Sequence, residues 1–103
     1  MSAPDLQPLL ALAAALQEAS KQKAAHYAPI ARQLIRSRSI HIQEIEHTLD
    51  HLLDVACIPE GLAPFKALCR YYFTLDPAAT ATYINGYREM WDSDADQETE
   101  AET

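Results

Sequence analysis

The residues with the strongest potential for chemistry are three histidines set among carboxylates in the segment 41–54. Glu44 and His47 form a Glu-x-x-His pair, the spacing with which helices of di-iron carboxylate bundles present two metal ligands. His47 and His51 are four residues apart, a spacing that lets two imidazoles on a helix hold one divalent cation. A metal site of Glu44, His47 and His51 is therefore one hypothesis for this segment.

The helical phase of the segment argues against a metal site inside a bundle. At about 100° per residue, Glu44, His47 and His51 lie opposite the apolar residues of the same helix, whereas ligands in a bundle core must lie among them. A di-iron site also needs two such motifs and two further glutamates, which only two copies of this chain would supply. We therefore expect a solvated charged face or a partner interface here, with no metal and no cofactor.

Nothing in the sequence indicates a nucleophilic active site. The serines lack the Gly-x-Ser-x-Gly turn of hydrolases, and Cys57 and Cys69 form no Cys-x-x-Cys pattern. Two cysteines are too few for a disulfide framework, so we expect both to be buried apolar residues of a cytoplasmic protein. We accordingly predict that the protein is not an enzyme.

Most aromatic residues gather in the segment 71–91. They fit the core between two helices. Tyr83, Tyr87 and Trp91 are also candidates for an exposed anchor patch, because tyrosine and tryptophan dominate binding hot spots. Stacking on nucleic acid would require interleaved basic residues, and few lie near.

The charged residues form two blocks. Basic residues run from Lys21 to Arg38 with no acid between them, and acidic residues run from Glu44 to Glu60 with no lysine or arginine. On one helix this order opposes the macrodipole, which favours acids near the N-terminus and bases near the C-terminus. Two copies laid antiparallel would place each basic block against an acidic one. The alternative function is binding of nucleic acid by the basic segment from Lys21 to Arg38.

Apolar periodicity and breaker residues predict four helices and no strand. The expected helices span 5–27, 30–57, 64–75 and 77–91. The first is rich in alanine and places its leucines on one face that is able to pack. Pro29 separates the first two helices, because the residue before a proline disfavours the α conformation.

The helix predicted for 30–57 is the longest and most regular. Its apolar residues recur at heptad spacing, as in a coiled coil, and it would be about 40 Å long. Arg38 falls within this apolar stripe, where an unpaired guanidinium is costly to bury. Three alternatives are open: the helix bends at 37–39 and Arg38 reaches water, Arg38 pairs with an acid across an interface, or Arg38 binds an anion.

Composition sets the class of protein. A length of 103 residues indicates one domain, 49% of residues are apolar, and only 2 are glycine, which disfavours all-β folds. The net charge is −7, and most of it falls on residues 92–103, where acids alternate with small polar residues. We expect one helical domain at 1–91, followed by a disordered acidic tail at 92–103. No apolar run has the length of a membrane span.

Together these features predict an all-α compact bundle of about four helices with one long central helix at about 30–57. The predicted function is a non-enzymatic protein–protein interaction module, an adaptor or regulator, that forms a homodimer. Nucleic acid is a disfavoured partner and a membrane is not expected. The expected interface on the long helix comprises Arg32, Arg36, Arg38, Ile42, Ile45, Glu46, Leu49, Asp50 and Leu52.

Overall fold

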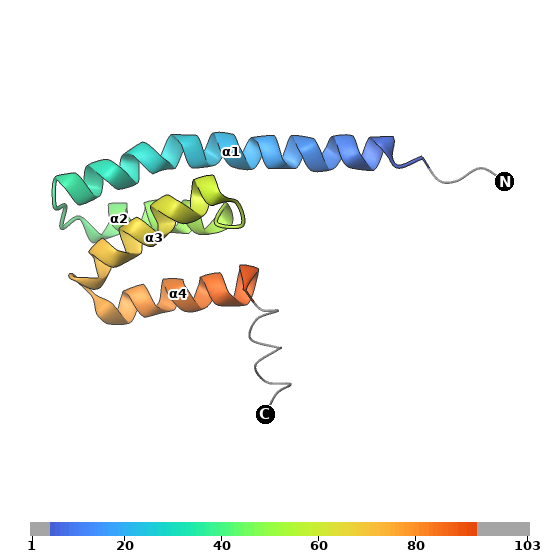
Figure 1. Cartoon of the computed structure of the whole chain (residues 1–103). Helices are drawn as coiled ribbons and strands as arrows, with labels where there is room; N and C mark the ends of the chain where they lie inside the picture. Colours follow the sequence, from blue (N-terminus) through green and yellow to red (C-terminus); the bar gives the residue numbers. More distant parts are fainter. Residues whose placement is uncertain (1–4, 93–103) are drawn as a thin grey trace, which may run out of the picture.

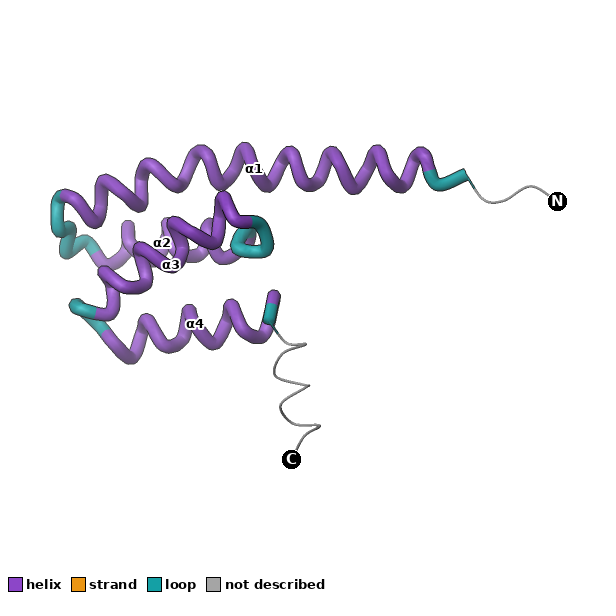
Figure 2. The backbone as a smooth tube through the Cα atoms, in the orientation of Figure 1, coloured by secondary structure: helices purple, strands orange, loops and turns teal. Residues whose placement is uncertain are grey.

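The structure, a computed structural model, describes residues 5–92 and contains four α-helices in that range. The helices are α1 (Gln7–Arg36), α2 (Ile42–Asp54), α3 (Pro59–Phe73) and α4 (Pro77–Trp91) (Figure 1). No strand occurs among the described residues (Figure 2). The predicted all-α bundle of four helices is therefore confirmed.

The long helix predicted for 30–57 is wrong as a single element. Its first part, up to Arg36, belongs to α1, and its second part forms α2. α1 instead passes through Pro29, which lies exposed inside the helix. A proline inside a helix costs about 3 kcal/mol. Ile30 and Leu34 pack in or against the core just beyond it, and this packing outweighs the local preference.

α1 ends in a Schellman motif at Arg38. The Ser39 N–H donates to the Leu34 carbonyl at 3.0 Å, and the Arg38 N–H donates to the Ile35 carbonyl at 3.1 Å. Arg38 has a positive φ of 52°, the left-handed conformation that such motifs require. Its side chain is exposed. Of the three alternatives for Arg38, the structure therefore has the one in which the guanidinium reaches water, with a complete helix end in place of a bend.

The buried Ser39 fixes the turn between α1 and α2. Its Oγ accepts a hydrogen bond from the His41 N–H at 3.2 Å, and its carbonyl accepts one from the Tyr71 hydroxyl at 2.7 Å. Tyr71 belongs to α3, so the turn is anchored to the third helix. α1 and α2 consequently form an antiparallel helical hairpin (Figure 1).

The start of α3 also differs from the prediction. The helix begins at Pro59 rather than Pro64, again with a proline at a first helical position. Gly61 lies in the first turn of α3 against the backbone of Val55, where a Cβ would come 2.1 Å from the Val55 carbonyl oxygen. Gly61 is therefore required by a close approach between the helix and the preceding turn, and does not itself form the turn.

α4 has the bounds that the sequence predicts, 77–91. Asp76 caps its N-terminus, because the carboxylate accepts a hydrogen bond from the Ala79 N–H at 3.0 Å. At the other end of α4, the indole N–H of Trp91 donates to the Leu53 carbonyl of α2 at 2.8 Å. Both ends of α4 are thus fixed.

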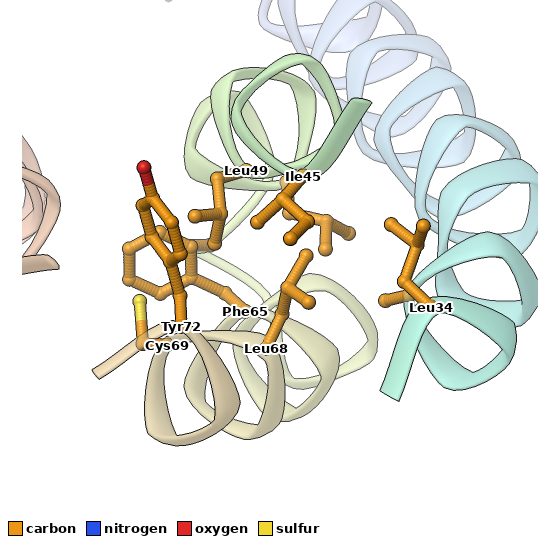
Figure 3. Packing of buried hydrophobic residues seen from close by; sticks show 10 residues of the cluster. Leu34, Ile45, Leu49, Phe65, Leu68, Cys69 and Tyr72 are labelled. Atoms are coloured by element: carbon orange, nitrogen blue, oxygen red, sulfur yellow. The ribbon is translucent and has the colours of Figure 1, made fainter. Parts of the chain in front are cut away.

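α3 lies at the centre of the bundle and packs against the other three helices. Leu68 and Tyr72 of α3 and Leu49 of α2 have no exposed surface. Figure 3 shows these side chains converging between the helices. The whole core cluster comprises Ala31, Leu34, Ile45, Leu49, Leu52, Ala56, Phe65, Leu68, Cys69 and Tyr72.

The acidic tail predicted for 92–103 lies, apart from Asp92, outside the described residues. Within residues 5–92, none of the helices carries an apolar run of the length that a membrane span requires.

Candidate functional site

The N-terminal half of α1 projects beyond the rest of the bundle (Figure 1). With 30 residues, α1 is about 45 Å long, whereas the other helices have 13 to 15 residues and are about 20–22 Å long. Ala24 is the first residue of α1 that is buried. α2 and α3, the two helices that pack on α1, therefore cover only its second half.

The projecting half carries an exposed row of leucines. Leu9, Leu12 and Leu16 keep 62%, 57% and 61% of their surface exposed, and Leu6 and Leu10 keep 56% and 58%. We call these five residues the leucine stripe. Single exposed leucines are ordinary on protein surfaces, but a contiguous apolar set on one helix marks an interaction surface.

The leucine stripe continues the face with which α1 packs on the bundle. Positions 18 residues apart lie about five turns apart, so they point in one direction on a helix of about 3.6 residues per turn. Leu9 thus aligns with Tyr27, and Leu16 aligns with Leu34. Tyr27 and Leu34 pack in or against the core. The same apolar face of α1 is therefore covered at one end and open at the other.

The apolar part of the interface predicted on 30–57 lies mostly inside the chain. Ile45, Leu49 and Leu52 have no exposed surface and belong to the core cluster. Ile42, at the start of α2, keeps 42% of its surface exposed. Because the chain folds back between α1 and α2, the three buried residues pack against their own chain and offer no surface to a second copy.

The charged part of that predicted interface is divided between the two helices of the hairpin. Arg32 and Arg36 are exposed on α1, and Asp50 is exposed on α2. Glu46 is half-buried and accepts a hydrogen bond from the Tyr72 hydroxyl at 2.6 Å. Glu46 therefore holds two helices of one chain together.

An ion pair joins the basic block to the acidic block within one chain. Lys23 of α1 donates to the Asp54 carboxylate of α2 at 3.0 Å, so one member of the basic segment is already paired. Arg36 lies in the last turn of α1 and Glu44 in the first turn of α2, where each charge is favoured by the helix dipole. Basic residues followed by acidic residues would oppose the dipole of one long helix. The same order is favourable when the bases end one helix and the acids begin the next.

The histidines of α2 contact α1. The His51 ring stacks on Tyr27, with ring centroids 4.5 Å apart and planes 7° apart, and His47 meets His51 edge-on at 4.6 Å. Glu44 is exposed. Within residues 5–92, no group of three or more histidine, cysteine, aspartate or glutamate side chains is arranged to hold a metal ion. The structure thus brings His47 and His51 together, and among the described residues it supplies no third ligand there.

Burial lowers the pKa of His51. Nearby Lys23 and His47 lower this pKa further, while the carboxylates of Asp54 and Asp50 oppose the shift. The Nδ1 atom of His51 is buried and has no hydrogen-bond partner in the described chain. A proton added to His51 would therefore be poorly accommodated between α1 and α2, so the stack is a packing contact that favours the neutral ring.

The aromatic patch predicted from Tyr83, Tyr87 and Trp91 holds α4 against the bundle. The Tyr83 hydroxyl donates to the Glu46 carbonyl at 3.4 Å, and burial raises the pKa of Tyr83. Tyr87 packs beside Phe65, with ring centroids 6.0 Å apart. Trp91 keeps 40% of its surface exposed while its indole N–H is bonded to α2. These side chains therefore serve mainly contacts within the chain.

The two cysteines have different surroundings. Burial raises the pKa of the Cys69 thiol to about 11, so little thiolate forms at neutral pH. Cys57 is exposed in the turn between α2 and α3, and both cysteines are free. The prediction of a buried cysteine is thus confirmed for Cys69 and wrong for Cys57.

Sequence reasoning placed the leucines of α1 on a face able to pack, and missed that five of them remain uncovered. A second helix of about 40 Å would have covered the whole face. Once the chain breaks between Arg36 and Ile42, no remaining helix of the described chain is long enough to do so. The break in the middle of the predicted helix therefore creates the exposed surface.

Comparisons with protein-family models, with curated proteins and with solved structures gave no significant match to this chain.

Proposed function

We propose that this protein is a helical protein-binding module that forms a homodimer through the leucine stripe of α1. The proposal is supported above all by one observation: each of the five leucines of the stripe keeps 56% to 62% of its surface exposed. They lie on the open continuation of a face that is otherwise buried. The proposal replaces the interface predicted on 30–57 with a surface that the chain itself leaves uncovered.

The leucine stripe has enough apolar surface to support association. Complete burial of one leucine contributes about 1.5–3 kcal/mol, so five leucines that are about 60% exposed contribute on the order of 5–9 kcal/mol. Lost translational and rotational freedom costs roughly 4–15 kcal/mol. A homodimer also buries apolar surface of the second copy, so the total apolar gain is of the same order as this cost and is compatible with an affinity in the micromolar range.

A cytoplasmic location and a non-catalytic role belong to the same proposal. Cys57 and Cys69 are free thiols, which are typical of proteins in reducing compartments. A small bundle with a projecting helix can engage a partner without opening its own core. This property suits an adaptor or regulator.

Sedimentation equilibrium of the full chain tests the proposal. The wild-type chain should be dimeric at about 100 µM, in the concentration range of a micromolar dimer. The double variant Leu9→Gln with Leu16→Gln should be monomeric, because it removes apolar surface while glutamine keeps a helix propensity close to that of leucine. The matched control is Ala11→Gln with Ala15→Gln, which adds the same amides to the opposite, exposed side of the same turns.

Circular dichroism at concentrations low enough for all of these proteins to be monomeric should give the same folded bundle, since every substituted residue is exposed. A wild-type chain that is monomeric at this concentration contradicts the proposal. So does a Leu9→Gln, Leu16→Gln variant that dimerises as well as the control.

A further inference from the structure

A groove with a cavity volume of about 600 Å³ lies between α3 and α4. Its floor includes the buried side chains of Phe65 and Cys69. Its walls include Phe73 of α3 and Ile84 of α4, which keep 57% and 43% of their surface exposed. Apolar residues that border a hollow and remain exposed favour the docking of another apolar surface.

The charged residues along this groove are all basic. Lys66 and Arg70 lie one turn apart on α3, Arg88 of α4 already makes an interaction of its own, and no acidic residue of the described chain lines the groove. Complementary potentials orient association and suppress wrong partners. The groove therefore fits an occupant that is apolar and negatively charged, and an amphipathic helix in an apolar groove is a common binding mode.

The projecting half of α1 supplies the apolar surface, and Asp5 just before the helix supplies a negative charge. Residues 5–20 include the leucine stripe and no lysine or arginine. The other acid of this segment, Glu18, lies on the side of α1 opposite the stripe. The stripe spans about 15 Å along the helix axis, whereas α3 and α4, with 15 residues each, are about 22 Å long. A helix of this length can lie along the groove.

The occupying helix cannot come from the same chain. α1 packs on α2 and α3 through its second half and does not contact α4 in the described chain. Its first half continues the same helix past the end of the bundle (Figure 1). The leucine stripe could reach the groove of its own chain only if α1 left the core, whereas the stripe of a second copy has no such restriction.

We propose that the leucine stripe of one copy lies in the α3–α4 groove of a second copy, with Asp5, which lies just before the helix, near Lys66 and Arg70. This inference rests on the proposed function and identifies the surface that receives the stripe. If each copy gives one helix and receives one, the exchange closes a dimer in which both stripes and both grooves are covered.

The competing arrangement is direct pairing of two leucine stripes. It would bring together two copies of the segment 5–20, each with the acids Asp5 and Glu18 and no lysine or arginine, and it would leave the groove open. Salt distinguishes the two arrangements, because screening weakens attraction between unlike charges and relieves repulsion between like charges. Added salt should therefore weaken association through the groove and strengthen pairing of two stripes.

The decisive experiment mixes two variants of the full chain. The stripe variant is Leu9→Gln with Leu16→Gln, and the groove variant is Phe73→Gln with Ile84→Gln. Each alone should self-associate at least about tenfold more weakly than the wild type, as expected when central apolar residues of an interface are lost. The control for the groove variant is Ala78→Gln with Thr82→Gln, on the exposed side of α4 away from the groove.

A mixture of the stripe variant and the groove variant should form a 1:1 complex. The intact stripe of the groove variant can enter the intact groove of the stripe variant, and one such contact per pair is available. Sedimentation velocity with the stripe variant labelled at the exposed Cys57 measures this complex directly.

The outcomes separate this inference from the proposed function. If the groove variant self-associates as tightly as its control, or if the mixture stays monomeric, the groove does not receive the stripe and the inference is wrong. If the stripe variant self-associates like the wild type, the proposed function itself fails.

A charge reversal tests the inference without touching the apolar walls. Lys66→Glu with Arg70→Glu alters two exposed residues, so the fold should be retained. We expect severalfold weaker self-association and a reversed dependence on salt. Unchanged affinity and unchanged salt dependence in this variant would contradict the assignment of the groove.

Discussion

The Tyr72 hydroxyl donates a hydrogen bond to the Glu46 carboxylate at 2.6 Å, although Tyr72 has no exposed surface. This contact joins α3 to α2 at the edge of the core. Burial raises the pKa of Tyr72, and the hydrogen bond to Glu46 raises it further, so the hydroxyl remains a donor at neutral pH.

The first prediction is that Tyr72→Phe lowers the free energy of unfolding by about 1–2 kcal/mol, because the half-buried carboxylate loses a hydrogen bond that nothing replaces. Urea denaturation at neutral pH measures the change. The control is Tyr87→Phe, since the Tyr87 hydroxyl makes no hydrogen bond with the described residues, and it should cost less than about 0.5 kcal/mol. Equal losses in the two variants would show that the Tyr72–Glu46 contact contributes nothing specific.

The second prediction concerns the two glycines, which should respond to alanine in opposite directions. Gly61→Ala should lower the free energy of unfolding by about 2 kcal/mol or more, because the new Cβ would lie 2.1 Å from the Val55 carbonyl oxygen and the backbone must move. Gly86→Ala should raise it by about 0.5–1 kcal/mol, because Gly86 is inside α4 and its nearest neighbour is a Leu53 methyl at 3.4 Å. Thermal unfolding of both variants checks the signs, and a stable Gly61→Ala protein would contradict the close packing of α3 on the preceding turn.

The third prediction is that Arg38→Gly stabilises the fold by about 0.5–1 kcal/mol. Arg38 has a φ of 52°, and the left-handed conformation costs a residue with a Cβ about 1–2 kcal/mol, which exceeds the added entropy of glycine in the unfolded chain. Ser37→Gly is the matched control, because Ser37 has a φ of −82° and gains no such relief, so it should destabilise the fold. Urea denaturation of the pair measures both effects, and a destabilised Arg38→Gly variant would mean that the arginine side chain itself holds the turn.

The fourth prediction is that His51 makes stability depend on pH. Its pKa is lowered in the fold from 6.5, so as pH falls below this value the unfolded chain takes up a proton more readily than the folded one. The stability supplied by neutral His51 is therefore present above pH 6.5 and is lost as pH falls. Glutamine does not titrate, so the His51→Gln variant lacks this contribution to the pH dependence. The free energy of unfolding of the wild type should thus exceed that of His51→Gln most at about pH 7.5 and least at about pH 5.5.

Urea denaturation across this pH range provides the comparison, since carboxylate titration elsewhere in the chain is common to both proteins. Parallel pH profiles for the wild type and His51→Gln would show that the ring accepts its proton without cost in the fold. In that case the stack on Tyr27 would not distinguish the two protonation states.

The number and type of the helices follow from the sequence because apolar periodicity and paired start signals agree, as at Asp76 and Pro77. The position of the first break does not follow from local preference. Pro29 favours a break, yet packing of the residues around it keeps α1 continuous. The actual break after Arg36 had a signal in the charge order, because bases followed by acids suit the end of one helix and the start of the next.

The exposure of the leucine stripe results from the break between Arg36 and Ile42 and could not be predicted from the leucines themselves. The leucines of α1 are visible in the sequence as one face of a helix. Whether such a face is covered depends on the length and direction of the helices that pack on it. A single helix at 30–57 would be long enough to cover the face, whereas α2, which begins at Ile42, is not. For the same reason Ile45, Leu49 and Leu52 were assigned to an interface, although they belong to the core.

The helix content of the uncovered half of α1 should also report whether a partner is bound to the leucine stripe. Among residues 5–92, no other helix packs on that half (Figure 1), so its helical hydrogen bonds depend mainly on the helix propensity of its alanines and leucines. Isolated helices of this length are marginal in water. Amide protons there should exchange with solvent faster than those between Ala24 and Arg36, where α1 is packed. A partner that covers the leucines must also order the backbone beneath them, so binding will be accompanied by a gain in helix content and will weaken on heating.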